Sequence, residues 1–258
     1  IGGSVTEIVY ALGQQDRLIA RDTTSSFPAE AQALPDVGYM RALSPEGVLS
    51  VQPDLILAEE GAGPPETIAV LEQAGIPFET IPAGIDADGL VGKIEAVADA
   101  LGVPDAAAGP VADMRADLAG LDRAAPEGGR KKIMFILSLQ GGRVMASGTG
   151  TEADAIIRLA GAENAIRTFE GYKPLTDEAI TAAAPDVILM MNRGEATASH
   201  DAADDDLLAM PAISTTPAAA SRSVIRMDGL YLLGFGPRTG RAAMELHRAI
   251  YGAGDGGA

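Results

Sequence analysis

The chain has 258 residues, 19 basic against 36 acidic side chains, a net charge of −17 and no cysteine. The acidic balance argues against nucleic acid as a partner, because binding to a phosphate backbone depends on clustered Lys and Arg. Disulfides and thiolate metal sites are excluded, and no apolar run approaches the ~20 residues that a membrane span needs.

Helical and strand patterns alternate along the chain, which is typical of α/β proteins. Ile1-Gly2-Gly3-Ser4 reads as the end of a strand that meets a helix start, so we expect the chain, and with it any signal region, to be trimmed ahead of Ile1. Helices are predicted over residues 6–12, with Ser4 or Thr6 as cap, and over 67–74, 90–101, 106–124, 207–210 and 239–251, with one more ending at Leu159. Strands are predicted over residues 18–21, 54–58, 78–81, 132–137, 144–146, 187–191 and 224–227, and a polar acidic loop over 192–206.

A sequence skeleton in the first half recurs in the second half without a gap. Its in-register pairs are Leu43/Leu175, Ser44/Thr176, Glu46/Glu178, Pro53/Pro185 and Asp54/Asp186. Tyr39 and Tyr172 precede these pairs in matching places, one position out of register. In each copy a hydroxyl residue two positions before a Glu predicts a helix cap, and Pro-Asp precedes a buried strand. Each tyrosine is expected in the loop just before its helix. The duplication predicts an N-terminal α/β lobe over residues 1–104, a linking helix over 105–126 and a C-terminal α/β lobe over 127–258.

Tyr39 and Arg41 are the sharpest candidates for chemistry. An exposed phenolate can bind ferric iron, and haem iron accepts Tyr as an axial ligand. A free phenol has a pKa near ~10, so iron and a neighbouring guanidinium such as Arg41 would have to favour the anion. On spacing alone, Tyr39 at a lobe edge and Arg41 as a surface charge is the simpler interpretation.

Four stretches resemble the haem-binding substrate-binding proteins of bacterial haem-uptake ABC transporters, within the wider family that binds cobalamin and ferric siderophores. They are residues 2–13, which begin Gly2-Gly3-Ser4-Val5-Thr6-Glu7, residues 37–49, which begin Val37-Gly38-Tyr39-Met40-Arg41-Ala42-Leu43-Ser44-Pro45-Glu46, and the stretches Gly171-Tyr172-Lys173-Pro174-Leu175 and Leu233-Gly234-Phe235-Gly236-Pro237-Arg238. The resemblance covers essentially the whole chain. It implies two α/β lobes with mostly parallel sheets, joined by a single long helix, with haem in the cleft between them.

The resemblance also implies roles for individual residues. Tyr39 is expected to be the axial iron ligand, Arg41 its partner, and Glu46 and Glu178 the contacts for arginines of the membrane permease. Where some relatives use a His, this chain offers Tyr172 and Lys173, which leaves open a second protein ligand or a pair of stacked haems. A periplasmic or extracytoplasmic monomeric carrier, free or lipid-anchored, without catalytic residues, is the expected form.

Further haem contacts are expected among basic and apolar side chains near strand ends. The candidates are Tyr172, Lys173, Arg238, Tyr231, Met40 and Met191, and also Phe27, Phe235, Arg21, Arg143, Arg193 and Arg226. For Lys173 and Arg238 a structural salt bridge is the equal alternative. His200, beside several Asp residues, is expected in a solvated loop and His247 in a structural role, so neither predicts a zinc or manganese site.

Three other readings remain open from the residues. A ferric-siderophore or cobalamin carrier of the same fold would use the tyrosines for stacking or hydrogen bonding. An α/β enzyme acting on a small anionic substrate would use the basic residues as an anion site, although the nucleotide and hydrolase motifs are incomplete. An interaction module would bind no ligand and would use only the surfaces that carry Glu46 and Glu178.

Overall fold

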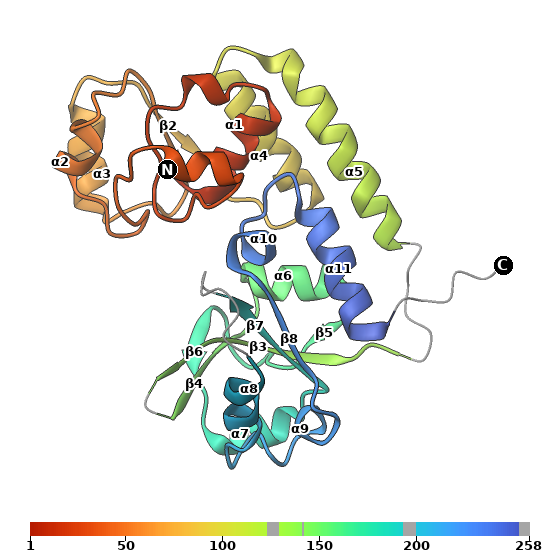
Figure 1. The fold of residues 1–258 in the computed structure, drawn as a ribbon. Coiled ribbons are helices and arrows are strands. Elements are labelled where there is room, and N and C mark those ends of the chain that lie inside the picture. The colour runs from red at the N-terminus through yellow and green to blue at the C-terminus, as the bar shows by residue number, and fades with distance from the viewer. Residues whose placement is uncertain (123–128, 141, 193–199, 253–258) are drawn as a thin grey trace. The chain divides into compact units, whose positions relative to one another are not determined.

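The computed structural model describes residues 1–122, 129–140, 142–192 and 200–252 (Figure 1). The chain divides into two compact units, which we call unit 1 (Ile1–Ala116 with Gly234–Thr239) and unit 2 (Asp117–Leu233 with Gly240–Ala258). The division falls within α5 (Ala108–Asp122), inside the helix that the sequence predicts as the link. The segment Gly234–Thr239 belongs to unit 1, although the sequence predicts it in the second lobe.

Unit 1 is built from short helices around a two-stranded parallel sheet. Its elements are α1 (Gly3–Ala11), α2 (Pro45–Leu49), β1 (Ile56–Glu59), α3 (Pro65–Gln73), β2 (Phe78–Ile81), α4 (Ala87–Ala100) and the first part of α5, with 3-10 turns at Gln15–Arg17, Ala29–Ala33 and Pro104–Ala107. β1 pairs with β2 from Ile56↔Phe78 to Glu59↔Ile81. An apolar cluster of Val37, Leu43, Val48, Ile56 and Leu71 joins this sheet to α2 and α3, with Ile1 packed against it.

Unit 2 has a larger, mostly parallel sheet. Its elements are β3 (Lys132–Gln140), β4 (Arg143–Ser147), α6 (Glu152–Leu159), β5 (Glu163–Asn164), β6 (Tyr172–Pro174), α7 (Asp177–Ala183), β7 (Val187–Asn192), α8 (His200–Leu208), α9 (Pro217–Ser221), β8 (Val224–Asp228), α10 (Gly229–Leu233) and α11 (Thr239–Tyr251). The strand order is β6-β4-β3-β7-β8, with β5 paired to β3; the β3/β4 and β4/β6 pairs are antiparallel and the others parallel.

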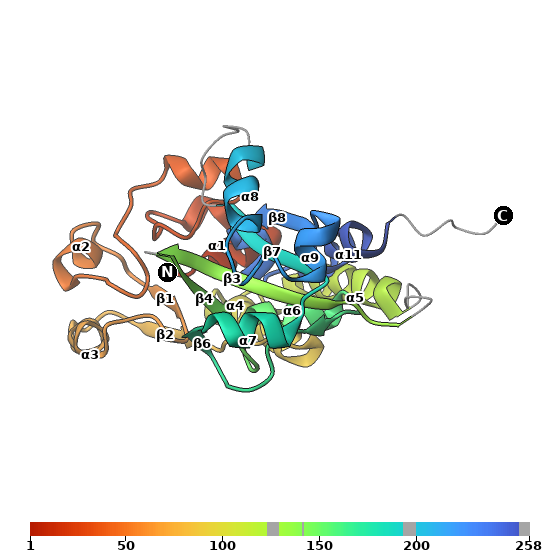
Figure 2. The same ribbon diagram turned by 90° about the horizontal axis from the view of Figure 1, so that it is seen from below.

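The central strand β3 is buried on both faces, which explains its continuous apolar run. Met134 and Ile136 face a cluster that includes residues of α7, α8 and α9. Figures 1 and 2 show these three helices along one face of the sheet, and Figure 1 shows α6, α10 and α11 along the other. Among the described residues no helix has the length and apolar character needed to span a membrane.

Both predicted helix caps of the repeat are confirmed. The Ser44 hydroxyl accepts a hydrogen bond from the Gly47 N–H and caps α2, and the Thr176 hydroxyl accepts one from the Ala179 N–H and caps α7. The duplicated local pattern of cap, short helix and strand is therefore real.

Several predictions about elements are wrong. α1 begins at Gly3 rather than at Thr6, so Ser4 and Thr6 lie buried inside the helix and do not cap it. Residues 18–21 form no strand, and only Arg21 makes a single bridge, to Asp36. Part of the expected acidic loop is helix α8, because Leu207 and Leu208 bury one side of it. Tyr172 begins strand β6 and does not lie in a loop.

Candidate functional site

Tyr39 lies in a loop of unit 1 whose backbone is held on both sides. The Thr23 N–H donates to the Gly38 carbonyl at 3.0 Å, the Ala42 N–H to the Tyr39 carbonyl at 2.8 Å, and the Gly63 N–H to the Met40 carbonyl at 2.8 Å. Such a loop presents its side chains from a fixed backbone, because its carbonyl groups are already satisfied.

Side chains of this loop alternate between the core and the surface. Val37 and Met40 are buried, and Tyr39 between them is 47% exposed. Gly38 makes the change of direction possible because its φ is +104°, a conformation that residues with a Cβ rarely adopt. The loop thus anchors itself through Val37 and Met40 and leaves the phenol outside.

The Tyr39 hydroxyl bonds to no group within the described part of the chain, and Arg41 is exposed two positions later. No hydrogen bond joins Tyr39 and Arg41 in this structure. With respect to the described residues, the loop therefore offers a hydroxyl oxygen and a guanidinium that are both free to bind. An oxygen ligand beside a positive charge suits ferric iron that is carried by an anionic ligand.

Tyr172, the counterpart of Tyr39 in the repeat, has a different environment. Its ring is half-buried against Phe135, with ring centroids 6.4 Å apart, and its hydroxyl donates to Glu152 Oε2 at 3.4 Å. Burial, with the Glu152 carboxylate next, raises the pKa of Tyr172 to about 12. A phenol with a raised pKa loses its proton less readily and is a poorer source of phenolate. The two tyrosines therefore differ in their surroundings, although their sequence positions match.

Glu46 and Glu178 occupy equivalent positions in their helices. Each is exposed and stands two residues after the capping hydroxyl, in the first turn of α2 and of α7. Hydrogen bonds from its own backbone N–H and from Thr176 lower the pKa of Glu178. Both carboxylates are therefore available to a partner, and the nearby helix N-terminus favours their negatively charged form.

Arg238 is engaged inside unit 1. Its guanidinium makes two hydrogen bonds to the buried Glu7 carboxylate, at 2.9 and 2.5 Å, and lies 3.5 Å from the centroid of the Phe27 ring. This arrangement corresponds to the structural alternative that the sequence left open for Arg238, and it ties the segment Gly234–Thr239 to α1.

The remaining candidate contacts differ in their availability. Lys173 is exposed, with its ammonium 5.3 Å from the Phe169 ring, whereas Met191 and Tyr231 are half-buried. Phe235 is 2% exposed, so the expectation that it covers a ligand surface does not fit this structure. Arg21 pairs with Asp36 and Arg226 with Asp204, Arg143 is exposed, and Arg193 lies outside the described residues.

Within the residues that the structure describes, no cluster of three or more metal-ligating side chains occurs. His247 is buried, and its Nδ1 lies 3.0 Å from the Ala160 carbonyl oxygen, as its predicted structural role requires. The side chain of His200 lies outside the described residues.

The sequence did not reveal the roles of two buried carboxylates of unit 1, Asp22 and Glu7. Asp22 accepts hydrogen bonds from the Gly2 N–H at 2.9 Å and from the hydroxyls of Thr24 and Ser25 at 2.6 and 2.7 Å. Glu7 binds a residue 231 positions away. Glu7 bonds to a residue far away in the sequence, and Asp22 bonds to a backbone N–H and to common hydroxyl side chains. For this reason no short sequence pattern predicts either role.

Unit 1 contains a cavity of about 440 Å³, lined by residues from Ile1 to Leu101, and unit 2 one of about 400 Å³ around Asn164. Tyr39 lines neither of them. The candidate site on unit 1 is thus an exposed surface with a projecting donor, and the larger cavity is a separate feature.

Comparison with known proteins supports one assignment. The solved structure of the periplasmic haem-binding protein BhuT in complex with two haems is 42% identical, with a TM-score of 0.89 over 97% of this chain and 96% of that one. An ABC transporter substrate-binding lipoprotein of Bacillus subtilis, YvrC, is 28% identical over 96% of this chain and 77% of its own length. A vitamin B12-binding protein of Vibrio parahaemolyticus is 25% identical over 93% of this chain and 84% of its own.

A family model described as periplasmic binding protein matches residues 1–230. Because the match spans most of the chain and the BhuT fold agrees throughout, the chain belongs to the periplasmic binding protein family.

Proposed function

We propose that this chain is an extracytoplasmic carrier that captures ferric haem through Tyr39 and delivers it to the permease of an ABC transporter. The observation that carries the proposal is the Tyr39 loop: a half-exposed phenol that bonds to none of the described residues, on a backbone fixed by its neighbours. The similarity to a haem-binding protein over nearly the full length of both chains supports haem as the cargo.

In this proposal the Tyr39 oxygen is the axial ligand of the haem iron. Ferric iron stabilises the phenolate that it binds, and a nearby guanidinium adds to this by favouring the negative charge. Arg41, which is exposed and close in sequence, takes this second role by donating to the bound oxygen or to a propionate. The loop contributes a fixed direction of approach, because its backbone need not rearrange.

Tyr172 does not supply a second phenolate in this account, because its hydrogen bond to Glu152 and its raised pKa of about 12 hold its proton. Lys173, exposed on the next position, is the better candidate for a propionate contact. The cleft between two lobes, and the number of haems that it takes, stay predictions of the resemblance.

We further propose that Glu46 and Glu178 are the permease contacts. Both carboxylates lie at the same place in a capped helix and point to solvent. Exposed acids of this kind pair with arginine in a bidentate manner, which gives orientation as well as affinity. Two such contacts on a duplicated unit fit a partner that is itself made of two similar halves.

A hemin titration followed by visible absorption tests the proposal. The wild-type chain is expected to saturate with a phenolate-type spectrum, and Tyr39→Phe to lose that spectrum and most of the affinity. Tyr172→Phe is the matched control, because it removes one hydroxyl from the corresponding place of the repeat. Equal spectra for wild type and Tyr39→Phe would contradict the proposal.

Carriage of cobalamin or a ferric siderophore is the second candidate, favoured by the vitamin B12-binding relative. Calorimetric titration with cobalamin and with hemin separates the two, since a cobalamin carrier would bind cobalamin more tightly than hemin. Turnover of a small anionic substrate would instead favour an enzyme, for which we propose no catalytic residue.

A further inference from the structure

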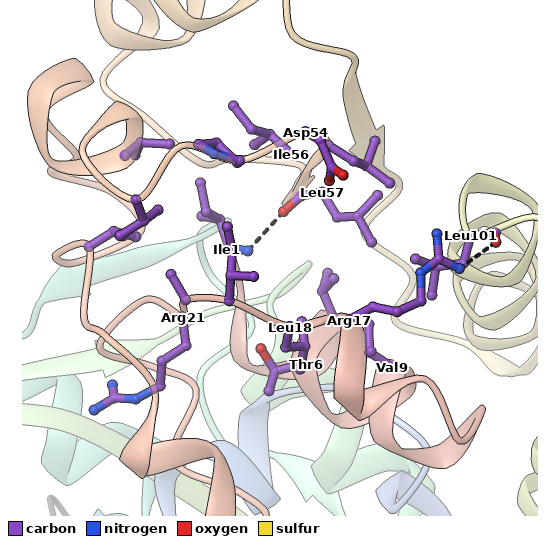
Figure 3. A pocket seen from close by; sticks show the side chains of 18 of the residues that line it. Ile1, Thr6, Val9, Arg17, Leu18, Arg21, Asp54, Ile56, Leu57 and Leu101 are labelled. Atoms are coloured by element: carbon purple, nitrogen blue, oxygen red, sulfur yellow. Dashed lines mark hydrogen bonds between the residues drawn. The ribbon is translucent and has the colours of Figure 1, made fainter.

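The cavities of unit 1 and unit 2 differ in how their arginines are engaged. In the cavity of unit 1, Figure 3 shows Arg17 bonded to the Leu101 carbonyl, at 2.7 Å, and Arg21 forms a salt bridge with Asp36 at 3.1 Å. Both arginines of that cavity therefore already bind groups of unit 1. The cavity of unit 2, with a volume of about 400 Å³, is lined by three arginines: Arg130, Arg158 and Arg167.

Two of the arginines in the unit 2 cavity have no such partner among the described residues. There the guanidiniums of Arg130 and Arg167 make no hydrogen bond or salt bridge, and both side chains are exposed. Arg158 is different, because it pairs with the buried Asp154 at 3.4 Å. Glu163 is the other carboxylate of the lining, and it pairs with none of the three arginines. Within the described residues, the cavity thus holds two unpaired positive groups and one unpaired negative group.

The buried part of this cavity is a polar network centred on Asn164. The Asn164 side chain, 4% exposed, donates to the Gly148 carbonyl at 2.9 Å and to Asp154 Oδ1 at 3.1 Å, and accepts from the Ile166 N–H at 3.0 Å. Asp154 Oδ2 accepts from the Gly150 N–H at 3.3 Å. Buried polar groups that have made their hydrogen bonds hold one arrangement, so this cavity is formed before a ligand arrives.

The backbone segments that carry the two unpaired arginines are also held in place. Arg130 precedes Lys131, whose carbonyl accepts from the Glu163 N–H at 2.9 Å. Arg167 follows Ile166, which is buried and bonded to the network. Only the two side chains need to become ordered when a ligand binds, which keeps the entropic cost of binding low.

We propose that this cavity binds a small organic phosphate, with Arg130 and Arg167 on the phosphate oxygens. Guanidinium groups bind phosphate through paired N–H···O bonds. A phosphate monoester carries a charge of about −1.5 to −2, so its attraction to two guanidiniums exceeds its repulsion by Glu163, whereas a single carboxylate gains less. Small-molecule sites have volumes of about 300–1,000 Å³, so a cavity of this size also accommodates an organic part such as a sugar.

The charge of the whole chain favours a soluble ligand over a lipid headgroup. A net charge of −17 repels an anionic membrane surface. A small anion inside the cavity instead lies close to two guanidiniums, well within the screening length of about 8 Å at physiological salt. We therefore expect the ligand to be a soluble ester of the size of a sugar phosphate.

Calorimetric titration with ribose 5-phosphate tests the proposal. The wild-type chain is expected to show saturable one-to-one binding, and Arg130→Gln combined with Arg167→Gln to weaken it by about 30-fold or more. Arg115→Gln combined with Arg248→Gln is the matched control, because it removes the same charge from two exposed arginines that do not line the cavity. The control is expected to weaken binding by less than about threefold.

Glu163→Gln is expected to have the opposite effect. It removes the negative charge that opposes the ligand, so ribose 5-phosphate should bind about threefold or more tightly. Ribose without its phosphate should give no saturable binding. This pair of results separates recognition of the phosphate from recognition of the sugar.

Several results would overturn the proposal. They are the absence of saturable binding of ribose 5-phosphate to the wild-type chain, equal losses in the two double variants, and equal binding of ribose. Binding to vesicles of phosphatidylcholine and phosphatidylglycerol, without binding of the soluble ester, would overturn it in favour of a membrane contact. Hemin titration of the same variants is expected to be unchanged, so failure of this proposal is distinguishable from failure of the proposed haem carriage.

Discussion

The Tyr39 loop and the Tyr172 strand carry the same repeated sequence skeleton but leave their phenols in opposite states. Tyr39 projects from a fixed loop, 47% exposed, with its hydroxyl unengaged among the described residues. Tyr172 is paired through β6 to β4, packs against Phe135 and donates to Glu152. Both copies therefore have the helix cap and the buried strand, but only the first leaves its phenol hydroxyl without a bond to any described residue.

The largest expected effect separates these two tyrosines. Tyr39→Phe should weaken hemin binding by about 100-fold, roughly 2.7 kcal/mol, because an iron–oxygen bond is lost and no protein contact changes. Tyr172→Phe should change it by less than about threefold, because its hydroxyl serves Glu152. Affinities from absorption titrations of both variants check this. Comparable losses of hemin affinity in the two variants would contradict the expected difference between the tyrosines.

The second expected effect concerns Glu46 and Glu178, the exposed glutamates that the two copies share. Glu46→Gln combined with Glu178→Gln should weaken binding to the permease by about tenfold or more, roughly 1.4 kcal/mol, and leave hemin affinity unchanged. Glu66→Gln is the matched control, because Glu66 is also exposed in the first turn of a helix, α3. Pull-down or surface binding with the permease in lipid discs provides the measurement. An equal loss of permease binding in the Glu66→Gln control would show that overall negative charge, and not these two positions, causes the effect.

A third, smaller effect tests the fixed backbone of the Tyr39 loop. Gly38→Ala should destabilise the protein by about 1 kcal/mol, because a Cβ is strained at a φ of +104°. It should also lower hemin affinity, since the direction of Tyr39 depends on this turn. Gly142→Ala, at a φ of +77° in unit 2, controls for the backbone strain without touching the loop. Denaturant unfolding and hemin titration together distinguish the two consequences.

The smallest effect is a pH dependence. The folded pKa of Tyr172 is about 12 against a usual value of 10.0, so between these values the folded state holds a proton that the unfolded state has lost. Stability contributed by this group is complete below pH 10 and is lost as the pH rises toward 12. Tyr172→Phe should show a shallower decline in unfolding free energy over that range. A decline as steep as that of wild type would show that Tyr172 does not cause it.

Much of the local structure follows from the sequence. Residues 78–81 and 239–251 are predicted with the bounds of β2 and α11, and both helix caps of the repeat are where a hydroxyl and a Glu indicate them. These features depend on neighbours within a few positions, which is why a single sequence can reveal them.

Features set by distant partners were not predictable in the same way. β6 exists because Tyr172 pairs with Ser147, and Arg238 is occupied because Glu7, far away in sequence, is buried beside it. Residues 18–21 have a strand-like sequence but only one paired backbone edge. For the site, the sequence and the resemblance pointed to Tyr39, and only the structure separates it from its repeat counterpart.

Resonance Raman spectroscopy of the hemin complex tests the central claim most directly, because it detects an iron–phenolate bond itself. The account predicts phenolate modes in the wild-type chain and in Tyr172→Phe, and their absence in Tyr39→Phe. Phenolate modes that persist in Tyr39→Phe, or that disappear in Tyr172→Phe, would contradict it.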